Sequence, residues 1–223
     1  MPLLSALTSE DRLVIGSMAA ALVGVGMGAL LAAPHFFGIT ALAVISLLII
    51  GWRVTRGPRL AWLLLFGLVA CILVLWVDWV HVVHFRSLVY TDYFGFRVLA
   101  SPSSMPVGWW LTVVQFGYLA LRLSDIWPRW VAVGSVTVMG MTVPPWYEEF
   151  AAPANAWYYT TSGPMLSHTP VWIIVTYGGC MFAVAVMALT YYAPRNWIGA
   201  VAGGIFTAAG IMLSGVIAYA LLA

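Results

Sequence analysis

Three acidic residues stand where an apolar chain tolerates them least. Asp78 lies near the end of one long hydrophobic run, and Glu148 and Glu149 directly follow another. The chain holds only seven Asp and Glu residues, so these three are a large share of its carboxyl groups. A carboxylate at a membrane boundary is costly unless it is paired, protonated or beside water. The pattern therefore indicates a functional role, and a carboxyl group kept neutral in such a place can donate a proton.

Imidazole, amide and aromatic groups accompany both acidic positions. His81 follows Asp78 by three residues, so the two side chains can touch if this run is helical, and Trp79 lies beside them. Pro144 and Pro145 precede the glutamates and should interrupt a helix, which is tolerated only inside the protein or beside a cavity. The remaining candidate binding residues around the glutamates are Trp146, Asn155, Trp157, Tyr158, Tyr159 and His168.

The combination of acids and aromatic rings favours one kind of chemistry. The chain has 12 Trp, 10 Tyr and 10 Phe residues. Each aromatic face stabilises a nearby cation by about 0.5–2 kcal/mol and offers no atom that would trap a carbocation. An acid beside an aromatic cage, reached from lipid, is what a proton-initiated isoprenoid cyclase or hydratase requires.

The elements that must position these residues are membrane-spanning helices. The chain is 63% hydrophobic and 7% charged, with a mean hydropathy of +1.00, which excludes a water-soluble globule. Crossing a hydrocarbon layer of roughly 30 Å takes about 20 residues. Runs of that kind occupy residues 13–33, 36–53, 60–85, 105–123, 127–147, 169–190 and 196–222. The prediction is an all-α, multi-pass protein of the cell membrane, with seven transmembrane helices in a single domain of residues 1–223.

Arginine placement predicts how this bundle is oriented. One side carries only Arg86 and Arg97, and the other carries Arg12, Arg53, Arg56, Arg59, Arg122, Arg129 and Arg195. Because positive residues in short loops stay in the cytoplasm, we expect the N-terminus inside and the C-terminus outside. Asp78 lies 19 residues after Arg59, and Glu148 lies 19 residues after Arg129. Both acids should therefore sit about 28 Å along outward-running helices, at the same depth near the outer surface.

Several other features are expected to be structural. Thr8 to Asp11 resembles a capped helix start, and no cleaved signal peptide is expected before it. Cys71 and Cys180 lie deep in their runs and should act as small packing residues. The boundary residues His35, Asp92 and Asp125 are also expected to be structural. The long links at 86–104 and 148–168 are rich in aromatic residues and prolines, which indicates segments that either re-enter the membrane or cap the bundle.

The stretch from Pro145 to Glu149, followed by Trp157 and Tyr158 and then by His168, Pro170 and Trp172, resembles a group of small integral-membrane terpenoid enzymes. The group comprises heterodimer-type lycopene cyclases, carotenoid hydratases, and the membrane cyclases of meroterpenoid and indole-terpenoid pathways. The resemblance implies a seven-helix enzyme without metal or cofactor. Such an enzyme protonates an epoxide or alkene of a lipophilic polyprenyl substrate and closes rings.

The chain departs from that pattern in two places. Two residues, Trp146 and Tyr147, separate Pro145 from the first glutamate, where the lycopene cyclases have one. The last run, 196–222, has no acidic residue, whereas the meroterpenoid cyclases are expected to carry one late in the chain. Asp78 and Glu148 thus remain equal candidates for the general acid.

The hypothesis assigns each candidate residue a role. Asp78 or Glu148 donates the proton, and His81 or Glu149 tunes it by pairing. Asn155 and Tyr159 position a polar head group or a water, with His168 nearby. The cation is walled by Trp79, Trp146, Trp157 and Tyr158. The expected partners are a polyprenyl small molecule and membrane lipid, with no nucleic acid, and the oligomeric state is left open.

Three other classes of protein share some of these features. A retinal-binding rhodopsin is excluded because it needs a lysine, and all nine basic residues here are arginine. A seven-helix sugar carrier remains an alternative, although helices one to three do not visibly repeat in five to seven. A metal enzyme is the third, because a mixed nitrogen and oxygen site is available from Asp78, His81, Glu148, Glu149 and His168. A purely structural role is the residual alternative.

Overall fold

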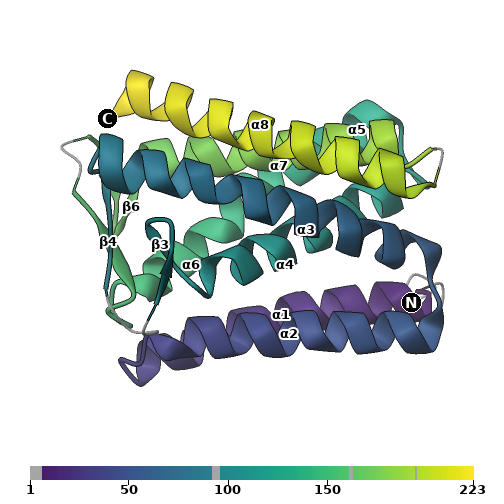
Figure 1. Ribbon diagram of the computed structural model, residues 1–223, viewed down its shortest axis with the longest axis horizontal. Coiled ribbons are helices and arrows are strands. Elements are labelled where there is room, and N and C mark those ends of the chain that lie inside the picture. The colour runs from purple at the N-terminus through teal and green to yellow at the C-terminus, as the bar shows by residue number, and fades with distance from the viewer. Residues whose placement is uncertain (1–6, 92–95, 161–162, 194) are drawn as a thin grey trace.

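The computed structural model describes residues 7–91, 96–160, 163–193 and 195–223, and over these ranges the chain is mostly α-helical. The helices are α1 (Ser9–Leu30), α2 (His35–Thr55), α3 (Pro58–Trp79), α4 (Met105–Leu123), α5 (Arg129–Thr142), α6 (Pro144–Ala151), α7 (Val171–Tyr191) and α8 (Trp197–Leu222). They run roughly along one long axis, with the start of α1 at one end of the bundle and the C-terminus at the other (Figure 1). Asp92 and residues 1–6 lie outside the described ranges.

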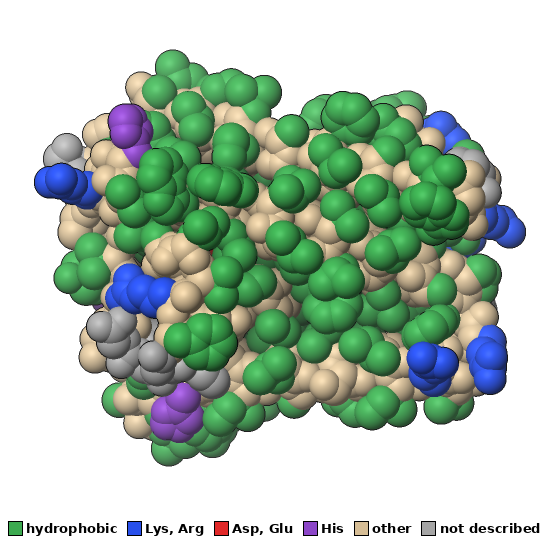
Figure 2. Space-filling view, in the orientation of Figure 1, with side chains coloured by type: hydrophobic (Ala, Val, Ile, Leu, Met, Phe, Trp, Pro, Cys, Tyr) green, Lys and Arg blue, Asp and Glu red, His purple; other side chains and the backbone are tan. Residues whose placement is uncertain are grey.

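Five of these helices are long and apolar enough to cross a membrane. They are α1, α2, α3 with its extension to His84, α7 and α8. Their outward faces carry large apolar side chains, among them Leu30, Val54 and Leu221, each at least three-quarters exposed. Figure 2 shows such side chains covering the flank of the molecule, with the basic side chains on this face confined to its two ends. These features are those of a membrane protein.

The core forms where α3 and α7 meet their neighbours. α3 packs against α4 and α8, α7 packs against α5 and α8, and the α1–α2 pair joins the bundle mainly through α2 on α4 and α1 on α6. A Cβ atom at Gly204 would lie 2.7 Å from the Phe66 carbonyl oxygen, so the glycine is what lets α8 touch the α3 backbone. Fully buried side chains such as Leu63, Phe66 and Val113 fill the centre.

α3 does not end as an ordinary helix. It continues as the π-helix η2 (Val80–His84), where the Phe85 N–H donates to the Val80 carbonyl over 2.9 Å. π-helical turns are rare in proteins, but those that occur are often found at functional sites. The wider turn changes the direction of the side chains that it carries. Here the turn carries His81, which is buried.

Short antiparallel strands close the bundle at the same end. β1 (Leu88–Tyr90) pairs with β4 (Trp157–Tyr159), β2 (Arg97–Val98) with β3 (Ser101–Pro102), and β5 (Met165–Leu166) with β6 (Thr169–Pro170). The first pair ties together the two long links that were expected to cap the bundle. All-α therefore describes the framework, and the strand pairing is an addition that the helical pattern did not predict.

The run predicted at 127–147 is broken in the structure. α5 ends at Thr142 and α6 begins at Pro144, because neither Pro144 nor Pro145 can donate a backbone hydrogen bond to continue the ladder. The break turns α6 inward and buries Glu148. The other six runs agree with helices to within a few residues.

The arginine-rich end holds its own polar cluster. Thr8 and Asp11 form a reciprocal capping box at the start of α1, which confirms the predicted helix entry. Asp11 also accepts hydrogen bonds from the Tyr118 hydroxyl at 2.9 Å and from Arg122 Nε at 3.0 Å. Burial alone would raise the pKa of Asp125, but Arg59 and Arg122 lower it below its usual value. This cluster locks α1, α3 and α4 together at the end opposite Asp78.

Candidate active site

A cavity of about 60 Å³ lies under the strand-capped end of the bundle. It is walled by α3, η2, α4, α6, α7 and α8 and by the paired strands β1 and β4. Five residues predicted from sequence line it: Asp78, His81, Glu148, Trp157 and Tyr159. Further polar or aromatic residues of the wall are Tyr90, Trp109, Trp172, Thr176 and Tyr177. The two acidic positions therefore share one cavity.

Glu148 is 3% exposed and is held by three donors. Its Oε2 accepts from Trp157 Nε1 at 2.6 Å and from the Tyr159 hydroxyl at 2.8 Å. Its Oε1 accepts from the Tyr177 hydroxyl at 2.5 Å. Burial raises the pKa of Glu148, and these three hydrogen bonds oppose the rise. Because both oxygens are engaged, the site is built to receive a carboxylate.

Asp78 is also buried, but it has fewer partners. Its Oδ2 accepts from the Ser101 hydroxyl at 2.8 Å and from the Tyr90 hydroxyl at 3.1 Å. The Trp109 indole N–H lies near this carboxyl group without reaching hydrogen-bond geometry. One oxygen of Asp78 is therefore less committed than either oxygen of Glu148.

His81 takes a partner other than the one predicted. Its Nδ1 lies 3.0 Å from the Ser87 hydroxyl, just beyond the π-helical turn, and no hydrogen bond joins it to Asp78. Its ring stacks on Trp172 with 4.9 Å between centroids and an interplanar angle of 14°. The π-helix explains the difference from the prediction, since the i, i+3 spacing of an α-helix does not apply across it.

The wall contains buried polar atoms without partners among the described residues. They are His81 Nε2, Trp109 Nε1, Trp172 Nε1 and Thr176 Oγ1. An unsatisfied buried polar atom costs roughly 1–3 kcal/mol, so several of them on residues that line one cavity indicate a place for water or for a polar part of a ligand.

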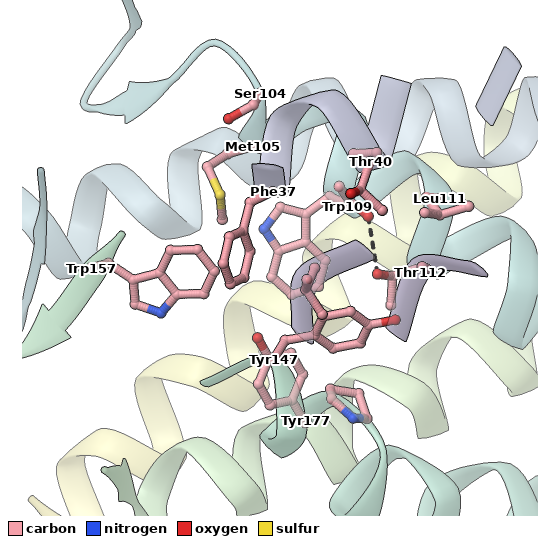
Figure 3. Close-up of a pocket in the computed structure, with 15 residues that line it drawn as sticks. Phe37, Thr40, Ser104, Met105, Trp109, Leu111, Thr112, Tyr147, Trp157 and Tyr177 are labelled. Carbon is pink, nitrogen blue, oxygen red and sulfur yellow. Dashed lines mark hydrogen bonds between the residues drawn. The ribbon is translucent and has the colours of Figure 1, made fainter. Parts of the chain in front are cut away.

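A second, apolar pocket of about 100 Å³ adjoins this cavity. It lies among α1, α2, α4 and α6 and shares four wall residues with the acid cavity: Met105, Trp109, Trp157 and Tyr177. Figure 3 shows the Phe37 ring between Trp157 and Trp109, with Tyr147 and Tyr177 across from them. The Phe37 and Trp157 rings meet edge to face at 4.9 Å. The acid cavity is thus polar, the neighbouring pocket is apolar, and large side chains separate the two.

The structure does not bring every candidate residue into the cavity. Trp79, Trp146 and Tyr158 are 37%, 57% and 51% exposed and do not line it. Asn155 is exposed, and its backbone has a positive φ of 54° in the turn before β4. On β4 the alternation of side chains sends Trp157 inward and Tyr158 outward, which explains why only one of these neighbours reaches the acids.

Glu149 and His168 pair with each other outside the cavity. Glu149 accepts from the Thr169 hydroxyl at 2.6 Å and from the His168 backbone N–H at 3.1 Å, and its Oε2 lies 3.2 Å from His168 Nδ1. Burial alone would raise the pKa of Glu149, but hydrogen bonds from Thr169, Ser167 and His168 bring it below its usual value. Glu149 therefore joins α6 to the β5–β6 turn and does not pair with Glu148.

No three His, Cys, Asp or Glu side chains converge to hold a metal ion in the ranges that the structure describes. The five residues that the sequence offers as metal ligands do not lie together. Asp78, His81 and Glu148 line the cavity, while Glu149 and His168 lie outside it.

Three of the five donors to the acids, Tyr90, Ser101 and Tyr177, are given no role by the sequence. Tyr90 and Ser101 come from the link after η2, and Tyr177 lies in the middle of an apolar run. Their only sequence signal is a hydroxyl group in a segment expected to cap the bundle or to be buried. Trp172, which stacks on His81, had been noted only as part of the family pattern.

A family model described as a domain of unknown function (DUF6989) matches residues 75–222, which is more than half of the chain. The chain belongs to the DUF6989 family. No curated protein and no solved structure matches it. Every residue that lines the acid cavity falls within the DUF6989 region, whereas α1 and α2, which wall the apolar pocket, precede it.

The lowered pKa of Glu149 predicts a pH-dependent stability. A carboxyl group whose pKa is depressed by folding stabilises the fold above its unfolded-state value of 4.5, and this stabilisation is lost as the pH falls through the lower folded-state value. We expect the thermal midpoint of the detergent-solubilised protein to fall below about pH 4.5. Glu149→Gln should have a lower midpoint at neutral pH and a smaller fall on acidification. Parallel pH profiles for the two proteins would contradict this account.

Proposed function

We propose that the protein is an integral-membrane terpene cyclase that protonates an epoxide or alkene of a polyprenyl substrate and closes rings through carbocations. The observation that carries the proposal is the pair of buried carboxyl groups, Asp78 and Glu148, on one aromatic-lined cavity. The resemblance of the Pro145–Glu149 stretch and its following loop to membrane terpenoid cyclases supports the same class.

The two acids are suited to different parts of this chemistry. Two like charges in one small, weakly polar space repel each other, so the pair retains a proton more readily than separate acids would. Three donors favour the ionised form of Glu148, whereas Asp78 has two. We assign the shared proton, and hence the role of general acid, to Asp78. Glu148 then supplies the negative charge that stabilises the cation.

The walls provide what a carbocation needs. Trp157, Trp172 and Tyr159 line the cavity beside the acids, and Trp109 separates it from the apolar pocket. Aromatic faces stabilise a cation by about 0.5–2 kcal/mol each, and by more when water is excluded. The apolar pocket is placed to take the isoprenoid chain, since its lining includes Val25, Phe37 and Leu111.

The unpartnered polar atoms favour a second outcome of the same chemistry. A water held by His81 Nε2, Thr176 Oγ1 or Trp172 Nε1 would lie in the acid cavity. Attack of that water on the cation would give an alcohol, so a hydratase using the same acids is the alternative function.

We extend the proposal to the membrane arrangement. α1, α2, α3, α4, α5, α7 and α8 form seven spans in the cell membrane, with the N-terminus in the cytoplasm and the C-terminus outside. The arginine bias supports this orientation. α6 and the paired strands then lie at the outer boundary, where a lipophilic substrate would enter from the bilayer.

Single cysteines test the orientation. Trp127 and Leu166 are exposed residues at opposite ends of the bundle, and native Cys71 and Cys180 are buried. In intact cells, a membrane-impermeant maleimide should label Leu166→Cys, and should label Trp127→Cys only after permeabilisation. The reverse pattern, or labelling of both variants from outside, would contradict the proposed topology.

Loss of either acid tests the chemistry. The purified protein in detergent should convert the terminal epoxide of farnesyl acetate into an isomer of unchanged mass, or into a product heavier by one water if it hydrates. Asp78→Asn and Glu148→Gln should each lower turnover by a factor of about 100 or more, because each removes a group that acts in the transition state. Mass spectrometry of the extracted products measures both effects.

The matched control is Asp125→Asn, which removes a carboxylate at the other end of the bundle and should keep turnover. Thermal midpoints confirm that each variant is folded. Full turnover by both acid variants would contradict the catalytic roles of Asp78 and Glu148. Vesicles that transport a solute without altering it would favour a carrier instead.

A further inference from the structure

His81 lines the acid cavity and carries a buried ring nitrogen, Nε2, whose contacts the structure leaves unfilled. The side chain is 5% exposed, and its Nε2 has no hydrogen-bond partner among the described residues. The imidazole is nevertheless held firmly. It stacks on Trp172 and meets the Tyr219 and Phe85 rings at 5.6 Å and 5.4 Å between centroids. The ring is thus fixed on three sides while Nε2 stays free.

A glycine leaves room beside that nitrogen. Gly215 on α8 faces His81, and a Cβ atom there would lie 3.1 Å from Nε2. That distance is shorter than ordinary van der Waals contact, so any larger residue at position 215 would crowd Nε2.

The contacts of Ser87 favour an unprotonated Nε2. The Ser87 hydroxyl lies 3.0 Å from His81 Nδ1 and 3.4 Å from the His81 carbonyl oxygen. A hydroxyl has one proton to donate. If it donates to the carbonyl, it can accept from Nδ1–H, and both contacts are satisfied. If it donates to Nδ1, the carbonyl contact is lost. The first arrangement leaves a lone pair on Nε2, directed away from Ser87.

The other titratable groups of the cavity are already engaged. Tyr90 donates to Asp78, and Tyr159 and Tyr177 donate to Glu148. A cysteine thiol such as that of Cys180 is ordinarily protonated near neutral pH and is a poor proton acceptor. His81 is therefore the best placed base among the cavity residues that the structure describes.

We propose that His81 is the base that ends the reaction by accepting a proton from the final carbocation. This inference rests on the proposed function. The Asp78 O–H bond breaks as the substrate gains a proton, and ring closure then moves the positive charge to another carbon. A C–H bond next to that carbon breaks, its electron pair forms a C=C bond, and the proton goes to His81 Nε2. The product is an isomer of the substrate, and proton exchange with water restores both residues.

Separating the donor from the acceptor has a physical purpose. The carbon that loses a proton lies several bonds from the site first protonated, so the conjugate base of the initiating acid is badly placed to remove it. Asp78 on α3 and His81 on the π-helical turn line the same cavity without bonding to each other. The π-helix thereby serves the mechanism by turning His81 away from the acid.

Product analysis tests the assignment. His81→Asn keeps a polar group near Ser87 and removes Nε2, and His84→Asn is the matched control because His84 is an exposed histidine of the same π-helix. With the terminal epoxide of farnesyl acetate as probe, His81→Asn should lower turnover by about 100-fold. It should also replace the wild-type product with several alkene isomers or water adducts. Gly215→Ala should move the product mixture in the same direction, and His84→Asn should match wild type.

Two outcomes separate this inference from the proposed function. If the wild type leaves the probe unchanged, the proposed function fails. If the wild type converts it and His81→Asn yields the same product at the same rate, His81 is not the base.

A measurement without turnover decides the inference independently. In ¹⁵N-histidine-labelled protein, the signal that His81→Asn removes should show a pyridine-type Nε2 and a pyrrole-type Nδ1. A pyrrole-type Nε2 would overturn the proposal, whatever the turnover result.

Discussion

Burial of two carboxyl groups in one small cavity is the constraint on which this end of the molecule depends. Removing a carboxyl group from water is tolerated only when donors replace the lost hydration or when the group keeps its proton. Glu148 draws its donors from β4 and α7, and Asp78 draws its donors from β1 and β3. The strand-capped end is thus arranged around the oxygen atoms of these two residues.

The same requirement explains the irregular backbone. An unbroken helix through residues 127–147 would carry Glu148 past the bundle, and the proline break returns it to the interior as part of α6. The pairing of β1 with β4 joins the links that supply Tyr90, Trp157 and Tyr159. The π-helical turn then adds His81 to the wall. Each departure from regular helix brings at least one polar group to the cavity. Irregular backbone at membrane depth is tolerated only where protein buries it or where it lines a water-filled cavity.

The hydrophobic pattern predicted the helices well, because a span needs about 20 apolar residues and little else. Arginine positions and residue counts also predicted that Asp78 and Glu148 would lie at one end, and both line the same cavity. The partners of the acids could not be predicted this way. Tyr177 and Ser101 are distant in sequence, and only tertiary packing brings them to the carboxyl groups. The pairing of His81 with Asp78 was wrong because it assumed an α-helical turn where the chain forms a π-helix. Trp79 and Trp146 were included for their position next to the acids in sequence, which does not decide the direction of a side chain.

The central claim is that this cavity holds a carbocation, and a structure with a bound cation mimic tests it most directly. N,N-Dimethylfarnesylamine combines an isoprenoid chain with a nitrogen that is protonated at neutral pH and so imitates the positive charge. The account predicts its nitrogen in the acid cavity between Asp78 and Glu148, with the chain passing Trp109 into the apolar pocket. Density for the amine only on the lipid-facing surface, with the cavity free of it, would contradict the account.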